Sequence, residues 1–216
     1  MDRKSSIKLT ASTLRRYAGD MTKPYHHGDL RAALLAAAEE IVNRDGIAGL
    51  TLRGVAREVG ASHAAPKNHF DDLTGLVSEL AAVGFTRFAN RMQAAAAQQA
   101  NPQDKLNAIG RAYVEFALAD PGLFQLMFRG ERLDKTRPAL HEAMLRAFGT
   151  LTGSVAATHE GDPDAARATR AHAARAWSMV HGFAILLLDD RLNPLLDAGA
   201  PRTDALALLD DMLTMG

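Results

Sequence analysis

A chain of 216 residues, 47% of them hydrophobic, has enough apolar material for one large domain or two small ones. This share argues against disorder, and alanine and leucine outnumber the 6% of aromatic residues, as is typical of a helical protein. The absence of cysteine excludes disulfides and thiolate metal sites and fits a reducing cytoplasm. The longest strongly apolar run, FAILLL at 183–188, is far shorter than the roughly 20 residues of a membrane-spanning helix. The N-terminal stretch has no apolar signal segment, so we expect a cytoplasmic protein with no membrane partner.

The net charge is zero, but it is unevenly placed along the chain. Residues 1–70 carry 11 Lys and Arg against 7 Asp and Glu, a net charge of +4, and residues 71–216 carry 14 against 18, a net charge of −4. The basic part also holds four of the eight histidines. A basic part on an acidic remainder indicates a polyanionic partner at one end, although a dipole of this size is common.

Residues 1–23 have no clear periodicity and carry six Lys and Arg. They are interpreted as a flexible basic extension, either solvated or acting as an arm that contacts phosphates. Alternatively, Met21 is the native start and the first 20 residues are an extension. Helical periodicity follows at residues 26–46, where the apolar residues share one face and Gly46 is suited to end the helix.

The next stretch, LTLRGVAREVGAS, predicts a second helix and a sharp exit. Thr51 is a suitable N-cap, and Gly60 can adopt the left-handed conformation that a tight turn needs. Ser62 is expected to cap a third helix immediately, which leaves a connection of about three residues. Two short helices joined in this way are typical of a helix-turn-helix.

The third helix has the composition of a recognition helix, which fits the major groove of DNA. Ala64 and Ala65 would let the backbone approach a duplex or pack against the first helix, and Pro66 costs little near a helix start. Lys67 offers charge to a phosphate, and Asn68 can pair with adenine or bind a phosphate. A helical hairpin in an ordinary bundle would also fit this pattern. The predicted DNA-binding residues are Thr51, Arg53, Ser62, His63, Ala64, Lys67, Asn68 and His69.

The rest of the chain is also predicted to be helical. It shows no sustained period-2 alternation, so we expect no strands, and it contains no internal repeat. Asn, Pro, Asp and Gly clusters separate the segments. The predicted helices cover residues 71–98, 102–119, 122–129, 137–159, 163–191 and 201–214, with a loop at 130–136.

TLRGVAREVGAS followed by HAAPKNHF resembles the DNA-binding domain of tetracycline-repressor-like (TetR family) regulators, and KPYHHGDLRAALLAAA resembles a common start in this family. The resemblance covers residues 23–80 and implies an all-α homodimer that binds a palindromic double-stranded DNA operator. The N-terminal three-helix helix-turn-helix domain would bind DNA, and the larger C-terminal helical domain would bind a small-molecule effector and dimerise. The chain would then divide into the extension 1–23, a DNA-binding domain at 24–72 and an effector-binding and dimerisation domain at 73–216.

The chain departs from the family pattern at two positions. Family members usually have an aromatic residue, most often Tyr, at the position of Lys67, and often have Lys at the position of Leu73. Both family residues typically contact phosphate. Lys67 could replace one of these contacts, whereas Leu73 puts in doubt how tightly the operator is held.

LADPGLFQLMFRG and AWSMVHGFAILLLDDRL resemble one C-terminal subclass of the family, named for a Trp–His–Gly signature that corresponds here to Trp177, His181 and Gly182. The aromatic and methionine residues of this half would either pack a helical core or line an apolar pocket marked by polar groups. The helices at 163–191 and 201–214 could pair with their copies as a four-helix dimer interface. The candidate effector-binding residues are Phe116, Phe124, Met127, Phe128, Met144, Phe148, Trp177 and His181.

The chain lacks the common catalytic motifs, including GxSxG, GxxxxGK and HExxH. HEAML at His141 has no second histidine, and the adjacent residues of HHGD at 26–29 would rarely converge on one ion. We therefore expect no catalytic residue, no metal site and no cofactor.

The leading interpretation is a ligand-responsive DNA-binding transcriptional regulator, a repressor that a small, largely apolar effector releases from its operator. A helical small-molecule-binding protein or small enzyme that kept the fold without operator binding is the alternative. A third reading is an adaptor that works through its C-terminal helices.

Overall fold

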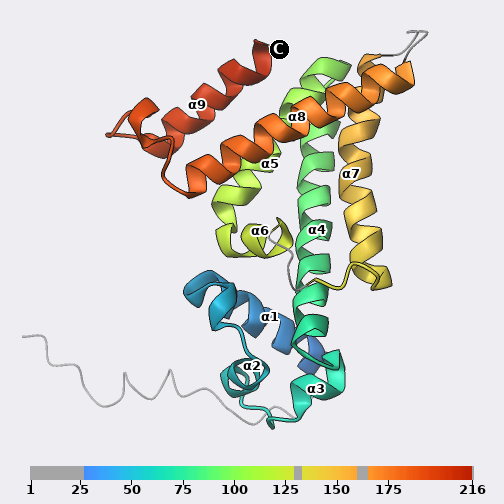
Figure 1. The fold of residues 1–216 in the computed structure, drawn as a ribbon, viewed down its shortest axis with the longest axis vertical. Coiled ribbons are helices and arrows are strands. Elements are labelled where there is room, and N and C mark those ends of the chain that lie inside the picture. Colours follow the sequence, from blue (N-terminus) through green and yellow to red (C-terminus); the bar gives the residue numbers. More distant parts are fainter. Residues whose placement is uncertain (1–26, 129–132, 160–164, 216) are drawn as a thin grey trace, which may run out of the picture.

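The computed structural model describes residues 27–128, 133–159 and 165–215 (Figure 1). These residues form α-helices and two short 3-10 helices joined by turns, with no strand among them, which confirms the all-α fold class. The predicted extension, residues 1–23, lies outside the described part of the chain. No helix in the described ranges is long and apolar enough to cross a membrane.

The helices form two groups at opposite ends of the molecule (Figure 1). The first three lie together at the lower end, the others lie above them, and α4 runs from one group into the other. The elements are α1 (His27–Asp45), η2 (Ile47–Gly49), α2 (Leu52–Glu58), α3 (Ala65–Phe70), α4 (Leu73–Ala97), α5 (Pro102–Ala119), α6 (Pro121–Phe128), α7 (Pro138–Thr158), α8 (Ala165–Leu188), η3 (Asn193–Leu195) and α9 (Pro201–Thr214).

The first two helices follow the predicted pattern. The apolar face of α1 is buried, with Leu34 and Ile41 at 0% and 3% exposure. Gly46 ends α1 with a positive φ of 72°. Thr51 caps α2, because its Oγ1 accepts a hydrogen bond from the N–H of Gly54 at 3.0 Å.

The turn between α2 and α3 is longer than predicted and spans residues 59–64 instead of about three residues. Gly60, with φ 65°, donates its N–H to the carbonyl of Arg57, and Ala61 donates to the carbonyl of Ala56 at 2.9 Å. This double closure satisfies the last carbonyls of α2 and ends the helix before the turn. The predicted exit at Gly60 is confirmed, and the turn is longer because α3 begins only at Ala65.

The start of α3 also differs from the prediction. Ser62 is not the N-cap: that position is held by Ala64, which makes no side-chain hydrogen bond to the helix. Ser62 instead contributes its backbone carbonyl, which accepts from the N–H of Ala65 at 3.0 Å. Pro66 lies in the first turn, where its missing N–H has no helical partner to lose. Phe70, 1% exposed, anchors the other end of α3 in the core.

Helix α4 belongs to both groups. Its 25 residues extend over about 37 Å at 1.5 Å per residue. It packs against α1 and α3 in the lower group and against α5, α6 and α7 in the upper one (Figure 1). The ring of Phe88 on α4 lies 4.8, 5.1 and 6.0 Å, centroid to centroid, from the rings of Tyr113, Phe116 and Phe128. This aromatic cluster holds α4 against α5 and α6.

The last two helices complete the upper group. α8 packs against α5 and α7, and α9 packs against α5 while diverging from α8 (Figure 1). α4, α5, α6, α7, α8 and α9 each begin and end within a few residues of the predicted bounds. The predicted order of helices is thus confirmed from α4 onward.

The corner between α3 and α4 leaves no room for a side chain at Gly75. Asp72 caps α4, because its Oδ1 accepts a hydrogen bond from the N–H of Gly75 at 2.7 Å. A Cβ at Gly75 would lie 1.9 Å from the carbonyl oxygen of Phe70. Glycine at this position therefore allows the start of α4 to approach the end of α3.

We expect Gly75→Ala to lower the free energy of unfolding by about 1–3 kcal/mol, because the added methyl group must push the two helices apart. Gly153→Ala is the matched control, since a Cβ there meets nothing within 4 Å on the surface of α7. The control should be neutral or stabilising by up to about 1 kcal/mol. Urea unfolding followed by circular dichroism measures both, and equal stability of the two variants would contradict the prediction.

Candidate functional site

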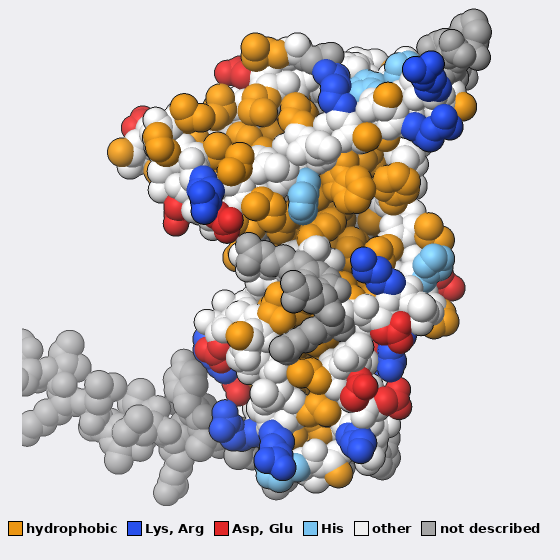
Figure 2. Space-filling model, in the orientation of Figure 1, with side chains coloured by type: hydrophobic (Ala, Val, Ile, Leu, Met, Phe, Trp, Pro, Cys, Tyr) orange, Lys and Arg blue, Asp and Glu red, His pale blue; other side chains and the backbone are white. Residues whose placement is uncertain are grey.

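A basic tip forms where α2 meets α3. Lys, Arg and His side chains gather at this lower end of the molecule (Figure 2). Seven of the eight residues predicted to bind DNA are exposed here, and His69 is half-buried beside the ring of Phe70. The exposed ones are Thr51, Arg53, Ser62, His63, Ala64, Lys67 and Asn68.

The two faces of α3 are clearly separated. Ala65 and Phe70 are buried, whereas Lys67 and Asn68 are exposed. Of the two roles weighed for the alanines, Ala65 packs inside and Ala64 is exposed in the turn. The structure therefore brings a cation and an amide to one short surface that a DNA groove could accept.

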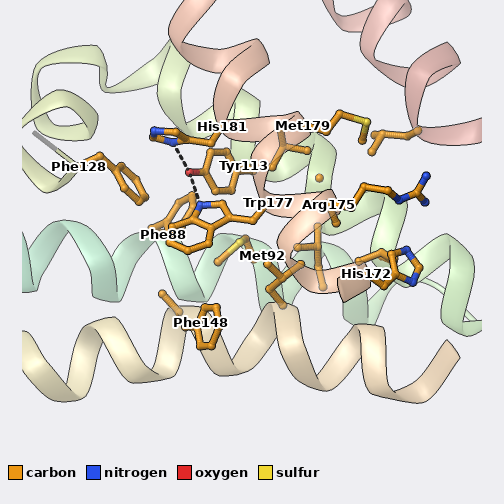
Figure 3. Close-up of a pocket in the computed structure, with 18 of the residues that line it drawn as sticks. Phe88, Met92, Tyr113, Phe128, Phe148, His172, Arg175, Trp177, Met179 and His181 are labelled. Atoms are coloured by element: carbon orange, nitrogen blue, oxygen red, sulfur yellow. Dashed lines mark hydrogen bonds between the residues drawn. The ribbon is translucent and has the colours of Figure 1, made fainter. Parts of the chain in front are cut away.

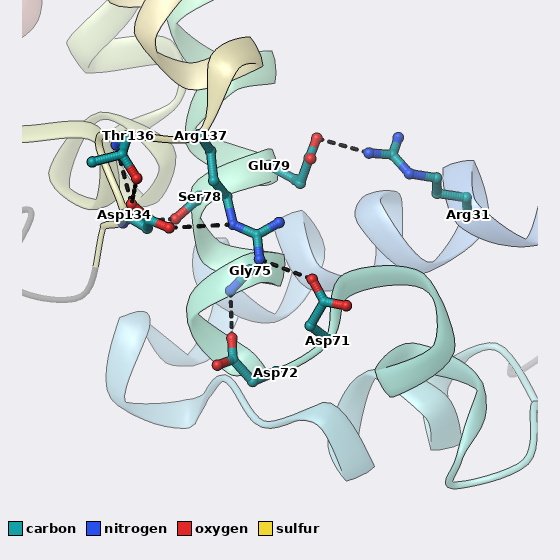
Figure 4. A network of polar contacts seen from close by, with 9 residues as sticks. All are labelled: Arg31, Asp71, Asp72, Gly75, Ser78, Glu79, Asp134, Thr136 and Arg137. Atoms are coloured by element: carbon teal, nitrogen blue, oxygen red, sulfur yellow. Dashed lines mark hydrogen bonds and ion pairs between the residues drawn. The ribbon is translucent and has the colours of Figure 1, made fainter.

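A polar network lies directly behind this surface (Figure 4). Asp71 follows α3 with a positive φ of 66°, and its Oδ2 accepts a hydrogen bond from Arg137 Nη2 at 3.0 Å. Arg137 is the N-cap residue of α7 and also lies 3.8 Å from a carboxylate oxygen of Asp134. The backbone N–H of Asp134 donates to the hydroxyl of buried Ser78 on α4 at 2.9 Å. The start of α7 is thus tied to both α4 and the end of α3.

The position at which family members often have Lys is occupied differently here. Leu73 is half-buried and packs against the core, so it offers no charge to DNA.

Hydrogen bonds from the hydroxyl and the N–H of Thr136 lower the pKa of Asp134, which keeps that carboxylate charged next to Arg137.

A pocket of about 700 Å³ opens in the upper group and is lined from α4 to α9 (Figure 3). Its walls are mostly aromatic and aliphatic, as in small-molecule sites of this size. Phe116 and Phe124 are fully buried and lie in the core rather than among the lining residues. The other six predicted effector-binding residues, Met127, Phe128, Met144, Phe148, Trp177 and His181, all line the pocket.

The sequence did not single out Tyr113, which lies at the centre of the pocket's polar contacts (Figure 3). Its hydroxyl is 2.8 Å from Nδ1 of His181, and Nε1 of Trp177 donates to it at 3.3 Å. Burial raises the pKa of Tyr113 and lowers the pKa of His181, so both groups are neutral at pH 7. The sequence pattern that could have pointed to Tyr113 is its spacing of three residues from Gly110, which places both on the same face of α5.

Other polar residues line the pocket away from this network. They are Gln103, Asn107, Lys135, His141, His172 and Arg175. Arg175 and His172 lie at the opposite end from Phe128 (Figure 3). Burial, with the nearby charge of Arg175, lowers the pKa of His172. None of the described residues that line the pocket is an Asp or a Glu.

Residues 106–213 of this chain match the family model of the tetracyclin repressor-like C-terminal domain. The chain belongs to the tetracyclin repressor-like family. Its match to that domain covers the helices that form most of the pocket, from α5 to α9. The helix-turn-helix resemblance at 23–80 lies outside this match, so the two concern different parts of the chain.

Several known proteins are similar to this member of the tetracyclin repressor-like family. A solved protein of unknown function from Rhodococcus sp. RHA1 is 34% identical with a TM-score of 0.72, covering 90% of this chain and 98% of that one. The uncharacterized HTH-type transcriptional regulator YobS of Bacillus subtilis is 23% identical over 154 residues, which is 71% of this chain and 76% of YobS. The Bacillus subtilis regulator FadR, solved with stearoyl-CoA, is 16% identical with a TM-score of 0.65, and the match covers 85% of this chain and 96% of FadR.

Metal binding was considered for HHGD at 26–29, whose side chains lie outside the described part of this tetracyclin repressor-like chain. Among the described residues, no group of three or more His, Asp or Glu is placed to hold a metal ion. His159 and His172 form a contact, with Nε2 and Nδ1 3.1 Å apart, and within the described ranges they belong to no group of three such ligands.

The lowered pKa of His181 predicts a pH dependence of stability. Its ordinary value is 6.5, so the unfolded chain binds a proton more readily than the folded protein does. The resulting penalty on the folded state is absent well above pH 6.5 and grows as the pH falls from 6.5 toward the folded-state pKa. In an NMR titration the His181 ring resonance should have its midpoint below 6.5, and His181→Phe should lose less stability than wild type between about pH 7.5 and pH 5.5. A midpoint at or above 6.5 would show that burial does not control this group.

Proposed function

We propose that the protein is a ligand-responsive DNA-binding transcriptional regulator, a repressor that a small and largely apolar effector releases from its operator. One observation carries this proposal: α4 joins both sites. Its first turn packs on α3, which presents Lys67 and Asn68, and Phe88 and Met92 further along α4 line the pocket. An effector that favours one placement of α4 changes the geometry of α3, by as much as its affinities for the two states differ.

Family membership supports this function, because most of the residues that line the pocket fall within the matched domain. YobS is named an HTH-type transcriptional regulator, and FadR shares the fold and was solved in complex with stearoyl-CoA. The pocket suits binding without turnover, and we assign it no catalytic residue and no cofactor. We place the protein in the cytoplasm, where such a regulator meets DNA.

The proposed DNA interface is the tip of α2 and α3. Thr51 uses the oxygen of its hydroxyl to cap α2, which leaves its proton available to a phosphate, and Arg53 is exposed in the first turn of α2. Lys67 supplies charge and Asn68 supplies base recognition. Ser62, His63, Ala64 and His69 complete the proposed surface. The domain bounds that follow are 24–72 for DNA binding and 73–216 for the rest, with 1–23 as a basic extension.

We propose a homodimer built on α8 and α9. Leu186, Leu195 and Met215 are 41%, 70% and 85% exposed, so this end of the molecule leaves large apolar side chains in water. Burying them against a second copy would be favourable at roughly 25 cal/mol per Å². The dimer would place its two α3 helices at successive major grooves, about 34–36 Å apart.

We also place the chain in the subclass named for Trp, His and Gly. Trp177 and His181 both contact the hydroxyl of Tyr113, which gives two of these residues a shared role. A Cβ at Gly182 would meet nothing within 4 Å, so this glycine has no steric reason within a single chain. A contact with a second copy would supply one.

The test is binding to the DNA upstream of the protein's own gene at two salt concentrations, with an unrelated fragment as competitor. Specific binding that weakens steeply with salt is expected. Lys67→Ala should weaken binding to all sequences about equally, and Asn68→Ala should relax base preference about tenfold at one position of each half-site. Lys105→Ala, in the first turn of α5 and remote from α3, is the control and should bind as wild type does.

Two outcomes would count against this proposal. If Lys67→Ala and Asn68→Ala both bind as wild type does, α3 is not the recognition helix. Equal and weak binding to both fragments would favour the alternative, a helical small-molecule-binding protein without an operator. Leu73, which is half-buried against the core and carries no charge, is the structural feature that favours that alternative.

A further inference from the structure

The lining of the pocket restricts the charge of its ligand. Lys135 and Arg175 are cationic, three histidines join them, and no described lining residue is acidic. A cationic ligand would therefore be desolvated without a counter-charge, which costs several kcal/mol. On the described lining, neutral or anionic apolar molecules therefore fit better than lipophilic cations.

The hydroxyl of Tyr113 fixes the tautomer of His181. Tyr113 is 5% exposed, so its proton needs an acceptor within the protein. Nε1 of Trp177 is a donor only, and Nδ1 of His181 is the one acceptor in reach within the described ranges. The Tyr113 proton therefore points at Nδ1, and the proton of the neutral imidazole lies on Nε2.

The Nε2–H of His181 is a hydrogen-bond donor with no acceptor among the described residues. No hydrogen bond from it to another described residue is found. Among the described residues, Arg137 Nε is the one buried side-chain nitrogen or oxygen without a partner, so His181 Nε2 is not fully buried. The rings of Phe128 and Phe124 lie 4.9 and 5.8 Å from the imidazole, centroid to centroid. An unpaired donor next to apolar walls is unfavourable until an acceptor arrives.

We propose that the effector is a neutral, largely apolar molecule whose carbonyl oxygen accepts a hydrogen bond from His181 Nε2–H. This rests on the proposed function and names the ligand class of its pocket. A carboxylate could accept the same hydrogen bond but fits less well, because it would lose its hydration among apolar rings, and Arg175 lies at the opposite end of the pocket from Phe128, which contacts His181 (Figure 3). The body of the ligand would lie along Phe88, Met92 and Phe148, in a space of about 700 Å³.

Trp177 gives a direct readout, since it is the single tryptophan of the chain and lines the pocket. Four probes with a twelve-carbon body differ only in their head group: 2-dodecanone, dodecane, dodecanoate and dodecylamine. Titrations followed by Trp177 emission should show the ketone binding about tenfold more tightly than the alkane, and the amine most weakly. Dodecanoate should bind less tightly than the ketone.

The variants separate the hydrogen bond from the apolar contact. His181→Phe should remove the tenfold advantage of the ketone and leave dodecane binding within about twofold of wild type. Tyr113→Phe frees the tautomer and should reduce the advantage about threefold, so the inference stays testable if one variant folds poorly. His141→Phe, which removes another lining imidazole, should keep the full preference.

The outcomes distinguish this inference from the function on which it rests. Equal binding of the ketone and the alkane, tighter binding of dodecanoate, or an unchanged ketone preference in His181→Phe would each overturn the carbonyl assignment while the pocket keeps its effector role. If none of the four probes binds, both the assignment and the effector role of this pocket fail.

A second and independent inference comes from Arg137. It lies where α7 begins, and its Nε is buried without a hydrogen-bond acceptor while its Nη2 pairs with Asp71. Met144 and Phe148 of the same helix line the pocket. The N–H of Asp71 donates to the carbonyl of Lys67 at 2.9 Å, which ties the other end of the pair to α3. One ion pair thus links the pocket wall to the DNA-facing helix.

We infer that the Arg137–Asp71 ion pair, called the latch below, keeps α3 able to bind DNA. When α7 shifts, the Asp71 carboxylate loses its partner beside the DNA-facing surface, where it repels phosphate. The pair is partly exposed, with 27% and 83% of the two side chains accessible, so its effect comes from placing a charge rather than from stability.

A double-mutant cycle on operator affinity tests the latch without any effector. Arg137→Ala should lower the affinity about tenfold, and Asp71→Asn should not, because it removes the charge and Asn tolerates the positive φ. Arg137→Ala should then have little further effect in the Asp71→Asn background. Arg146→Ala, which removes another arginine of α7 that bonds to Asn90 and Gln93 of α4, is the control.

Operator binding should also change Trp177 emission in wild type and not in Arg137→Ala, because coupling between two sites is reciprocal. An Arg137→Ala protein that binds the operator as wild type does, or an equal loss of affinity in both backgrounds, would overturn the latch.

Discussion

The close approach of Gly75 to the carbonyl of Phe70 fixes the direction in which α4 leaves α3. A side chain there would collide with the backbone, so the two helices meet at one angle and α4 inherits the orientation of the recognition helix. The corner acts together with the packing of α1 on α6 and with the Arg137–Asp71 pair, which also join the two ends of the molecule. The pocket lies further along the same helix, where Phe88 and Met92 reach it. A ligand there acts on α3 through a helix that does not bend easily at its start.

The pocket combines two features that a stable core avoids. It leaves Phe148 and Trp177 48% and 40% exposed, and it keeps a hydrogen-bonded Tyr113, Trp177 and His181 within apolar walls. Burying these rings elsewhere would have favoured folding, and an apolar residue in place of His181 would have avoided an unpaired donor. A ligand of the proposed class would remove both costs at once, because its body would cover the rings and its acceptor would satisfy the donor. This complementarity would explain why a single chain tolerates so large an apolar opening.

Much of the fold could be predicted from the sequence, whereas the contacts that make the sites could not. Helical spacing identified the buried face of α1 and the order of helices, because a 3.6-residue period is a local property. It could not separate Phe116 in the core from Phe148 at the pocket, since both face other helices and only packing decides which one meets a void. Tyr113 and His181 are 68 residues apart, and Asp71 and Arg137 are 66 apart. Pairs so distant in sequence leave no periodic signal. The misplaced start of α3 has a local cause: Ser62 is of a residue type preferred at the N-cap, but Ala64 holds that position.

The charge balance around α3 shows how the departures at Lys67 and Leu73 can coexist with DNA binding. A basic residue next to DNA at the start of α4 would attract phosphate whatever the state of the rest of the protein. Here Leu73 packs inside, and the residues before it are Asp71 and Asp72. Asp72 is engaged as the cap of α4, so Asp71 is the carboxylate whose partner decides the local field. With Arg137 in place the charge of Asp71 is paired, and without it an unpaired carboxylate directly follows the helix that carries Lys67. In the proposed latch, the loss of one fixed cation at Leu73 would transfer control of DNA affinity to a residue of α7, the helix that also forms a wall of the pocket.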